Sequence, residues 1–183
     1  MEELSLHILD IAENSVAAGA TLVEIGVEYQ LGKAPWLTIT VRDNGRGMSP
    51  EVASRVSDPF YTTRTTRKVG LGVPFFKMAA EMTGGSFDIR SRVGEGTTVT
   101  AVFGLSHIDR MPLGDLAGTI CLLMSCNQHI EVAYTRARDG ESATVRTSDF
   151  TAVLGDLPLS TPQVMEFIEG YIRENTENWN GGT

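Results

Sequence analysis

A strand pattern that ends in a carboxylate and two glycines constrains this chain more than any other feature. Residues 36–42 alternate apolar and polar side chains, as in a half-buried strand. Asp43 follows at once, and Gly45 and Gly47 next to it let a flat ring approach the backbone. Asp43 can accept a hydrogen bond from the exocyclic amine of adenine, a donor that guanine lacks at that position. The same motif is common in calcium loops and hairpins, so it predicts an adenine site only in the company of other features.

Several polar or glycine-rich segments surround this motif in the sequence. Residues 4–18 have helical spacing, and three polar residues of that stretch share a second face of the helix because they lie three and four positions apart. These residues are His7, Asp10 and Asn14. The other segments are residues 58–64, residues 69–73 at the start of a helical stretch, and residues 94–97 at the tip of a predicted hairpin.

In their order and spacing, these motifs resemble the nucleotide-binding boxes of the GHKL superfamily: gyrase, heat-shock chaperone, histidine kinase and mismatch-repair ATPases. The likeness covers roughly residues 1–105. Residues 13–20 look most like the mismatch-repair and gyrase version, whereas residues 59–64 and the Gly-Leu-Gly at 70–72 look more like bacterial sensor kinases. The resemblance implies ATP as the ligand and Mg²⁺ as its cofactor.

The resemblance also implies roles for individual residues. Asn14 matches an asparagine that helps to hold magnesium between the protein and the phosphates, where a neutral oxygen ligand is reasonable. Asp10 occupies the position at which the ATPase branches carry a glutamate that activates water. Asp10 is one methylene shorter, so two roles stay open: general base, or a group that only orients the magnesium ligands.

The remaining predicted contacts surround the rest of the nucleotide. Gly45 and Gly47 are expected beneath the adenine, Thr97 is expected to hydrogen-bond near it, and Phe60 is expected to support the base of a phosphate lid. Threonine hydroxyls, basic side chains and helix-start amides suit phosphate oxygens. The phosphate contacts expected on this basis are Thr63, Arg64, Gly70, Leu71 and Gly72.

The pattern along the chain predicts an α/β fold. Helices at 3–18, 50–57 and 73–83 alternate with strand pairs at 21–30 and 36–42, and at 86–92 and 97–105. This order indicates a two-layer α/β sandwich, with a mixed sheet and helices on one face. It is also the Bergerat-type fold that the resemblance implies.

Residues 106–183 are expected to form a small α+β C-terminal unit beside the ATP-binding domain of residues 1–105. The apolar run 116–125 fits either a helix or a strand. Asp139-Gly140 predicts a hairpin between 130–137 and 142–148, and an amphipathic helix is expected from about 162 to 175. No motif with recognisable chemistry lies in this unit, which we expect to pack on the ATP domain or on a partner. The wide apolar face of its helix must be covered by its own hairpin, by the ATP domain or by a second copy of the chain.

Composition limits the classes of function. The chain has 183 residues with 42% hydrophobic content, enough for one large domain or two small ones. Its net charge of −8 argues against a nucleic-acid surface. No apolar run reaches membrane-spanning length and no secretory pattern opens the chain, so we expect a cytoplasmic protein that does not enter the membrane.

Three functions remain open at this stage. The first is a histidine-kinase-like module that transfers the γ-phosphate of Mg-ATP to a histidine or serine of a separate partner protein. The second is a switch ATPase that drives a conformational or dimerisation cycle. The third is an ATP-sensing regulator without turnover, which reports to a partner through residues 106–183. The sensor-kinase-like segment 59–64 favours the first, and the carboxylate at Asp10 favours the second.

Overall fold

One sheet organises the whole chain. The computed structural model describes residues 3–60 and 71–177. In that part of the chain the first half contains α1 (Leu4–Ala17), β1 (Leu22–Gln30), β2 (Trp36–Asp43), α2 (Pro50–Arg55), α3 (Gly72–Glu81), β3 (Ser86–Arg92) and β4 (Gly96–Gly104). The second half contains α4 (Leu116–Cys126), β5 (Glu131–Arg138), β6 (Glu141–Arg146), α5 (Thr147–Leu154), α6 (Pro162–Ile172) and a π-helix, η1 (Arg173–Glu177).

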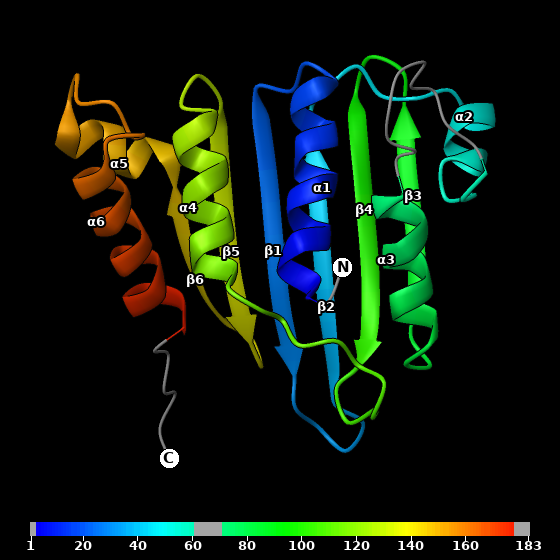
Figure 1. The fold of residues 1–183 in the computed structure, drawn as a ribbon. Coiled ribbons are helices and arrows are strands. Elements are labelled where there is room, and N and C mark those ends of the chain that lie inside the picture. Colours follow the sequence, from blue (N-terminus) through cyan, green and yellow to red (C-terminus); the bar gives the residue numbers. More distant parts are fainter. Residues whose placement is uncertain (1–2, 61–70, 178–183) are drawn as a thin grey trace.

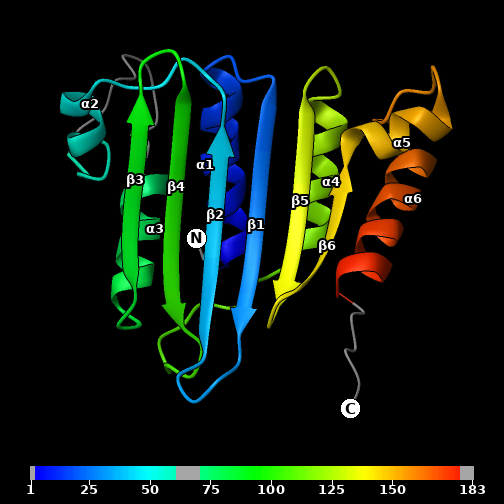
Figure 2. The same ribbon diagram turned by 180° about the vertical axis from the view of Figure 1, so that it is seen from behind.

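The six strands run in the order β3-β4-β2-β1-β5-β6. The pair β1–β5 is parallel and the other four pairs are antiparallel, so the sheet is mixed. Helices α1, α3, α4 and α6 cover one face, and the strands come to the front when the molecule is turned (Figures 1 and 2). The predicted two-layer α/β fold with a mixed sheet is therefore confirmed.

The core lies between the sheet and these helices. Alternate residues of the central strands turn inward and are almost fully buried, as period-two patterning predicts. In β1 and β2 these residues are Val23, Ile25, Val27, Leu37, Ile39 and Val41. The helical faces contribute Leu4, Ile8, Phe76, Leu116 and Ile120 to the same cluster.

The hairpin after residue 105 extends the first half's sheet, because β5 pairs with β1 in a register that sets Ile25 beside Tyr134. The run 116–125, which fitted a helix or a strand, lies within helix α4, whose N-cap, Asp115, accepts a hydrogen bond from Gly118 N at 3.0 Å. The division into two units at residue 105 stays a prediction.

One expected strand boundary is wrong. The second strand of the C-terminal hairpin was expected to reach Ser148, but β6 ends at Arg146 and α5 begins at Thr147. The cause is local: the Asp149 carboxylate accepts a hydrogen bond from Arg146 N at 2.8 Å, which satisfies a free amide at the start of the helix.

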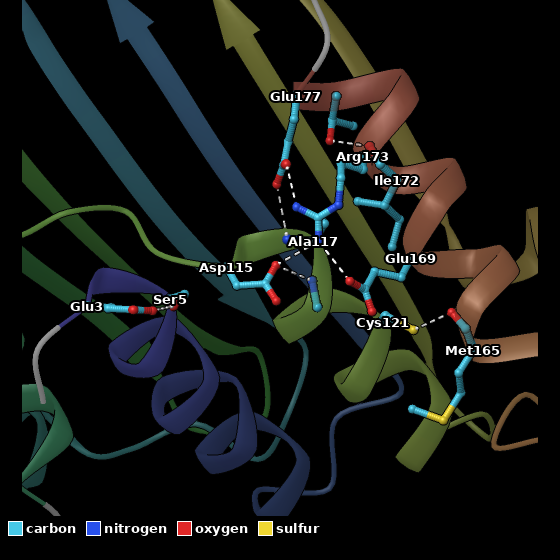
Figure 3. Close-up of polar contacts among 12 residues, drawn as sticks. Glu3, Ser5, Asp115, Ala117, Cys121, Met165, Glu169, Ile172, Arg173 and Glu177 are labelled. Carbon is cyan, nitrogen blue, oxygen red and sulfur yellow. Dashed lines mark hydrogen bonds and ion pairs between the residues drawn. The ribbon is translucent and has the colours of Figure 1, made fainter. Parts of the chain in front are cut away.

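Arg173 joins α6 and η1 to the start of α4 (Figure 3). Its guanidinium donates to Glu169 at 2.7 Å, to Asp115 at 3.1 Å and to Glu177 at 3.1 Å. Glu177 in turn accepts a hydrogen bond from Ala117 N at 3.3 Å. These contacts hold the end of the described chain against α4.

Among the described residues, no helix combines the length and the apolar character that crossing a membrane requires.

Candidate functional site

A cavity of about 600 Å³ opens between α1, the end of β2, the loop that follows it, and the start of α3. Its polar wall includes Asn14, Asp43 and Thr97, and its other walls are largely apolar. An apolar hollow of this size with a few convergent polar groups is typical of a small-molecule site. The apolar side chains are Ile11, Ala17, Ala18, Val41, Met48, Val52, Val56, Val73, Ile89 and Val99.

Asp43 forms the centre of the polar wall. It is 8% exposed, and it lies at the last position of β2, directly opposite Thr97 of β4. One carboxylate oxygen accepts from the backbone amides of Gly45 at 2.9 Å and Thr97 at 3.3 Å. The other accepts from the Ser15 hydroxyl at 2.6 Å. These bonds fix the orientation of the carboxylate against α1, β4 and the loop.

An ionised carboxylate has about four acceptor sites and no donor. Three hydrogen bonds from described residues leave about one acceptor site, and Asp43 lines the cavity. The wall can therefore accept a hydrogen bond from a donor placed in the cavity, and it disfavours an acceptor there.

The glycines next to Asp43 are required by the protein's own packing. A Cβ at Gly47, whose φ is +68°, would stand 2.0 Å from the carbonyl oxygen of Arg92, and a Cβ at Gly45 would stand 2.9 Å from Ala18. The sequence interpretation placed both glycines beneath the ligand. Gly47 does line the cavity, but the contacts that exclude a side chain at both positions come from neighbouring protein atoms.

Asp10 lies beside the cavity, against the start of α3. It is not among the residues that line the hollow; instead, its Oδ2 occupies the place where a Cβ of Gly72 would be, 1.5 Å from the ideal position. Gly72 is the first residue of α3 and Leu71 is its N-cap. The structure thus brings Asp10, Leu71 and Gly72 together, at the helix end that the sequence assigned to phosphate.

His7, one turn before Asp10 in α1, is 1% exposed. Its ring stacks on Phe76 of α3, with the ring centroids 5.7 Å apart. Burial lowers the pKa of His7, and the nearby Gly72 backbone and the charge of Asp10 oppose that shift. The ring is therefore mainly neutral at pH 7, with one donor nitrogen and one acceptor nitrogen.

The other predicted contacts are divided between the described and undescribed parts of the chain. Thr63, Arg64 and Gly70 lie outside the described residues. Phe60 is 95% exposed, so its side chain makes no wall of the cavity in this structure. Asn14 and Thr97 both line the cavity, as the sequence interpretation requires of residues that contact a nucleotide.

Sequence reasoning missed two serines. Ser15, 4% exposed, supplies the shortest bond to Asp43, and its position after Asn14 on a predicted helix was the available signal. Ser91 holds the glycine loop to the hairpin: it accepts from Met48 N at 2.8 Å and contacts the Thr97 hydroxyl at 2.8 Å. Nothing in a strand residue such as Ser91 marks it before the register is known.

Comparisons with solved structures support the fold. The N-terminal domain of a DNA repair protein superposes with a TM-score of 0.60 at 15% identity, covering 85% of this chain and 58% of that one. The Aquifex aeolicus MutL ATPase domain complexed with ADP superposes with a TM-score of 0.52 at 16% identity, covering 93% of this chain and 70% of that one. At these sequence identities, the similarity shows only that the chains share a fold.

Similar sequences occur within longer sensor proteins. The Pseudomonas aeruginosa sensor protein kinase FleS is 36% identical over 98 residues, which is 54% of this chain and 24% of FleS. A putative sensor histidine kinase NtrY-like of Rickettsia conorii is 26% identical over 110 residues, 60% of this chain and 18% of the relative. The chain thus spans about a fifth of the length of these relatives.

A family model described as "Histidine kinase-, DNA gyrase B-, and HSP90-like ATPase" matches residues 2–107, more than half of the chain. The match contains the whole wall of the cavity, from α1 to β4. The predicted resemblance to the GHKL superfamily is confirmed, and the chain belongs to this ATPase family.

Proposed function

We propose that the cavity binds ATP and that Asp43 recognises the adenine ring. The observation that carries this proposal is the carboxylate itself: three protein donors orient it, and about one acceptor site is left toward an apolar hollow. The exocyclic amine of adenine is a donor of the required kind. Guanine presents a carbonyl oxygen at that position, which would face the carboxylate with no proton between them.

The phosphates would then extend toward α1 and the start of α3. Asn14 lines the cavity on this side, and the first amides of α3 begin at Gly72. Among residues 3–60 and 71–177, no group of three or more histidine, cysteine, aspartate or glutamate side chains could hold a metal. A magnesium ion would accordingly rest on the Asn14 oxygen, the phosphates and water, an oxygen set that suits this ion. Thr63, Arg64 and Gly70 remain predicted phosphate contacts.

The chemistry that we favour is transfer of the γ-phosphoryl group to a histidine or serine of a separate partner protein. Two similar proteins are named as sensor kinases, which supports this choice. The phosphorus would exchange its bond to the bridging oxygen of ADP for a bond to the partner's nucleophile. Hydrolysis by a switch ATPase is the second candidate, because Asp10 supplies a carboxylate against the start of α3, where the phosphates would lie, and a carboxylate can accept a proton from water.

Calorimetry with ATP and GTP tests the binding proposal. ATP should bind and GTP should compete poorly. Asp43→Asn should weaken ATP binding more than tenfold, or about 1.4 kcal/mol, because a side-chain amide risks a donor facing a donor. Asp88→Asn is the matched control, since Asp88 is an exposed carboxylate of the same sheet. An unchanged ATP affinity in folded Asp43→Asn protein would remove the proposal.

Incubation with γ-labelled ATP and magnesium, with and without cell lysate, separates the candidate reactions. A labelled partner supports the kinase, free phosphate supports the ATPase, and retention of all label on ATP supports a sensor without turnover. Asp10→Asn should bind Mg-ATP and lose hydrolysis if Asp10 is the base, whereas Asn14→Ala should lose the magnesium dependence of binding. Full hydrolysis by Asp10→Asn would exclude Asp10 as the base.

A further inference from the structure

A buried histidine at the α1–α3 interface lacks hydrogen bonds of good geometry. Both ring nitrogens of His7 are buried and form no hydrogen bond of good geometry among the described residues, although the Gly72 backbone lies close enough to raise the pKa of the ring. Buried polar atoms in folded proteins are nearly always hydrogen-bonded, to protein or to ordered water. An apolar side chain would fill the same space without burying unsatisfied polar atoms. The imidazole therefore needs a hydrogen-bond partner that lies close to it in the fold.

The position of His7 limits what this partner can be. The ring stacks on Phe76 at an interplanar angle of 27°, which holds it between α1 and α3. The next polar group on the same helix face is Asp10, three residues later, where side chains of one helix are neighbours. Asp10 also reaches the α1–α3 interface, because its Oδ2 lies against Gly72 of α3.

Asp10 offers the acceptor that the histidine requires. The Asp10 carboxylate is near enough for its charge to raise the pKa of His7, against the lowering caused by burial. A neutral imidazole has one N–H donor, and a carboxylate has only acceptor sites. The two groups are therefore complementary. The imidazole N–H can donate a hydrogen bond to the carboxylate, and the negative charge of the carboxylate acts on the ring.

We propose that His7 is a positioning residue whose N–H holds the Asp10 carboxylate, directly or through one water molecule, and so fixes its direction beside the α3 helix start. This inference rests on the proposed function only in what it assigns to Asp10. His7 does not line the cavity, so it acts on a bound nucleotide through Asp10. A hydrogen bond from His7 would restrict rotation of the Asp10 side chain. This restriction would partly compensate for the length of aspartate, which is one methylene shorter than glutamate, because the carboxylate would stay in one direction.

A single-histidine protein tests the contact without any nucleotide. The only other histidines, His107 and His129, are exposed, so His107→Gln with His129→Gln leaves His7 as the one imidazole signal. Nitrogen-15 NMR of the ring then reports its tautomer and its hydrogen bonding. Asp10→Asn should shift the ring nitrogens and change the tautomer balance. Ring spectra that stay the same after the Asp10→Asn substitution would overturn the proposal, whether or not ATP binds.

A pair of His7 variants tests the consequence. His7→Phe keeps an aromatic ring against Phe76 but removes the N–H, and His7→Asn restores a donor. His7→Phe should keep ATP affinity and lose about 10- to 100-fold in turnover, as loss of an orienting partner usually does, and His7→Asn should recover part of it. Wild-type turnover in His7→Phe would contradict the positioning role. If the unaltered protein does not bind ATP, the proposed function is wrong, but the NMR test of the contact between His7 and Asp10 still applies.

Discussion

The two halves of the sheet are held together by different kinds of contact. Around the cavity, buried polar atoms meet at short distances: Ser15, Gly45 and Thr97 all donate to Asp43. In the second half, the buried residues of α4 and β5 are mostly apolar, and the prominent polar cluster, at Arg173, is partly exposed. The polar contacts of the first half therefore shape the wall of the cavity. Those of the second half hold α6 and η1 against α4.

This difference suggests that the second half supports the first without forming its cavity. Within residues 3–60 and 71–177, every residue that lines the cavity comes before residue 105. The halves nevertheless share β1, which pairs with β2 on one side and β5 on the other. Removing the second half at this strand tests whether the first half forms the cavity by itself.

Truncation after Leu105 should change solubility and association more than any single substitution. It removes β5 and α4, exposing the edge of β1 and the apolar surface that Leu116, Ile120 and Met124 cover. Exposed strand edges and large apolar patches promote association. We expect reduced solubility or a change of oligomeric state in size-exclusion chromatography, with part of the ATP affinity retained.

A truncation after Glu177 is the control, because it leaves all described helices and strands in place. A soluble, monomeric 1–105 protein that binds no ATP would contradict the comparison. That result would mean that the second half completes the nucleotide site.

Gly47→Ala should have the next largest effect, and Gly94→Ala isolates its cause. Both glycines have positive φ, +68° and +80°, but a Cβ at Gly47 meets the Arg92 carbonyl at 2.0 Å whereas a Cβ at Gly94 meets nothing within 4 Å. Gly94→Ala should cost about 1 kcal/mol of unfolding free energy from backbone strain. Gly47→Ala should cost clearly more and should also weaken ATP binding, as urea titration and calorimetry can measure. Equal losses for the two variants would show that strain alone, and not the tight packing of the cavity wall, explains Gly47.

Sequence reasoning succeeded where chemistry requires fixed spacing. The strand end at Asp43, the glycine turn and the helix containing Asn14 were all located, because periodicity and turn residues are local signals. The same approach missed Ser15 and Ser91, whose partners lie 28 and 6 positions away and are set by packing and register. It gave the correct fold for a related reason: alternating helices and strand pairs leave few layer arrangements.

The second half was harder to predict. The hairpin at Asp139-Gly140 was found from its turn, but its parallel pairing with β1 depends on a contact across about a hundred residues. No local pattern encodes such a pairing. Helix α5 was missed because the start signal, Asp149, looks like an ordinary polar strand-end residue until its bond to Arg146 is seen.

Each half buries one titratable side chain, and the two groups predict different responses to acid. His7 lies in the first half and Tyr134 in the second, and the polar side-chain atoms of neither form a hydrogen bond of good geometry among the described residues. Burial lowers the pKa of His7 below its ordinary value of 6.5, whereas burial raises the pKa of Tyr134 far above the physiological range. Below about pH 6.5 the unfolded chain therefore binds a proton at His7 that the folded chain does not, and stability falls as the pH falls.

His7→Phe should flatten this loss of stability below pH 6.5, and Tyr134→Phe should leave the pH dependence unchanged. Because the Tyr134 hydroxyl forms no hydrogen bond of good geometry among the described residues, Tyr134→Phe should also change the free energy of unfolding by less than about 1 kcal/mol at pH 7. Urea titrations between pH 5 and pH 8 measure both slopes. If the slope of His7→Phe matches that of the unaltered protein, the acid sensitivity comes from other groups.

Arg173→Met should have the smallest effect. The variant keeps the aliphatic stem but removes the guanidinium that contacts Asp115, Glu169 and Glu177. Its side chain is 43% exposed, and solvent-exposed ion pairs contribute about 0.2–1 kcal/mol. We expect a decrease in Tm of up to about 4 °C that diminishes at high salt, with no change in ATP affinity. Arg90→Met, which breaks the more exposed pair with Asp88, should give no measurable shift. A change in ATP affinity on Arg173→Met would show that the fastening of α6 reaches the cavity through α4 and α1, and that the two halves act as one.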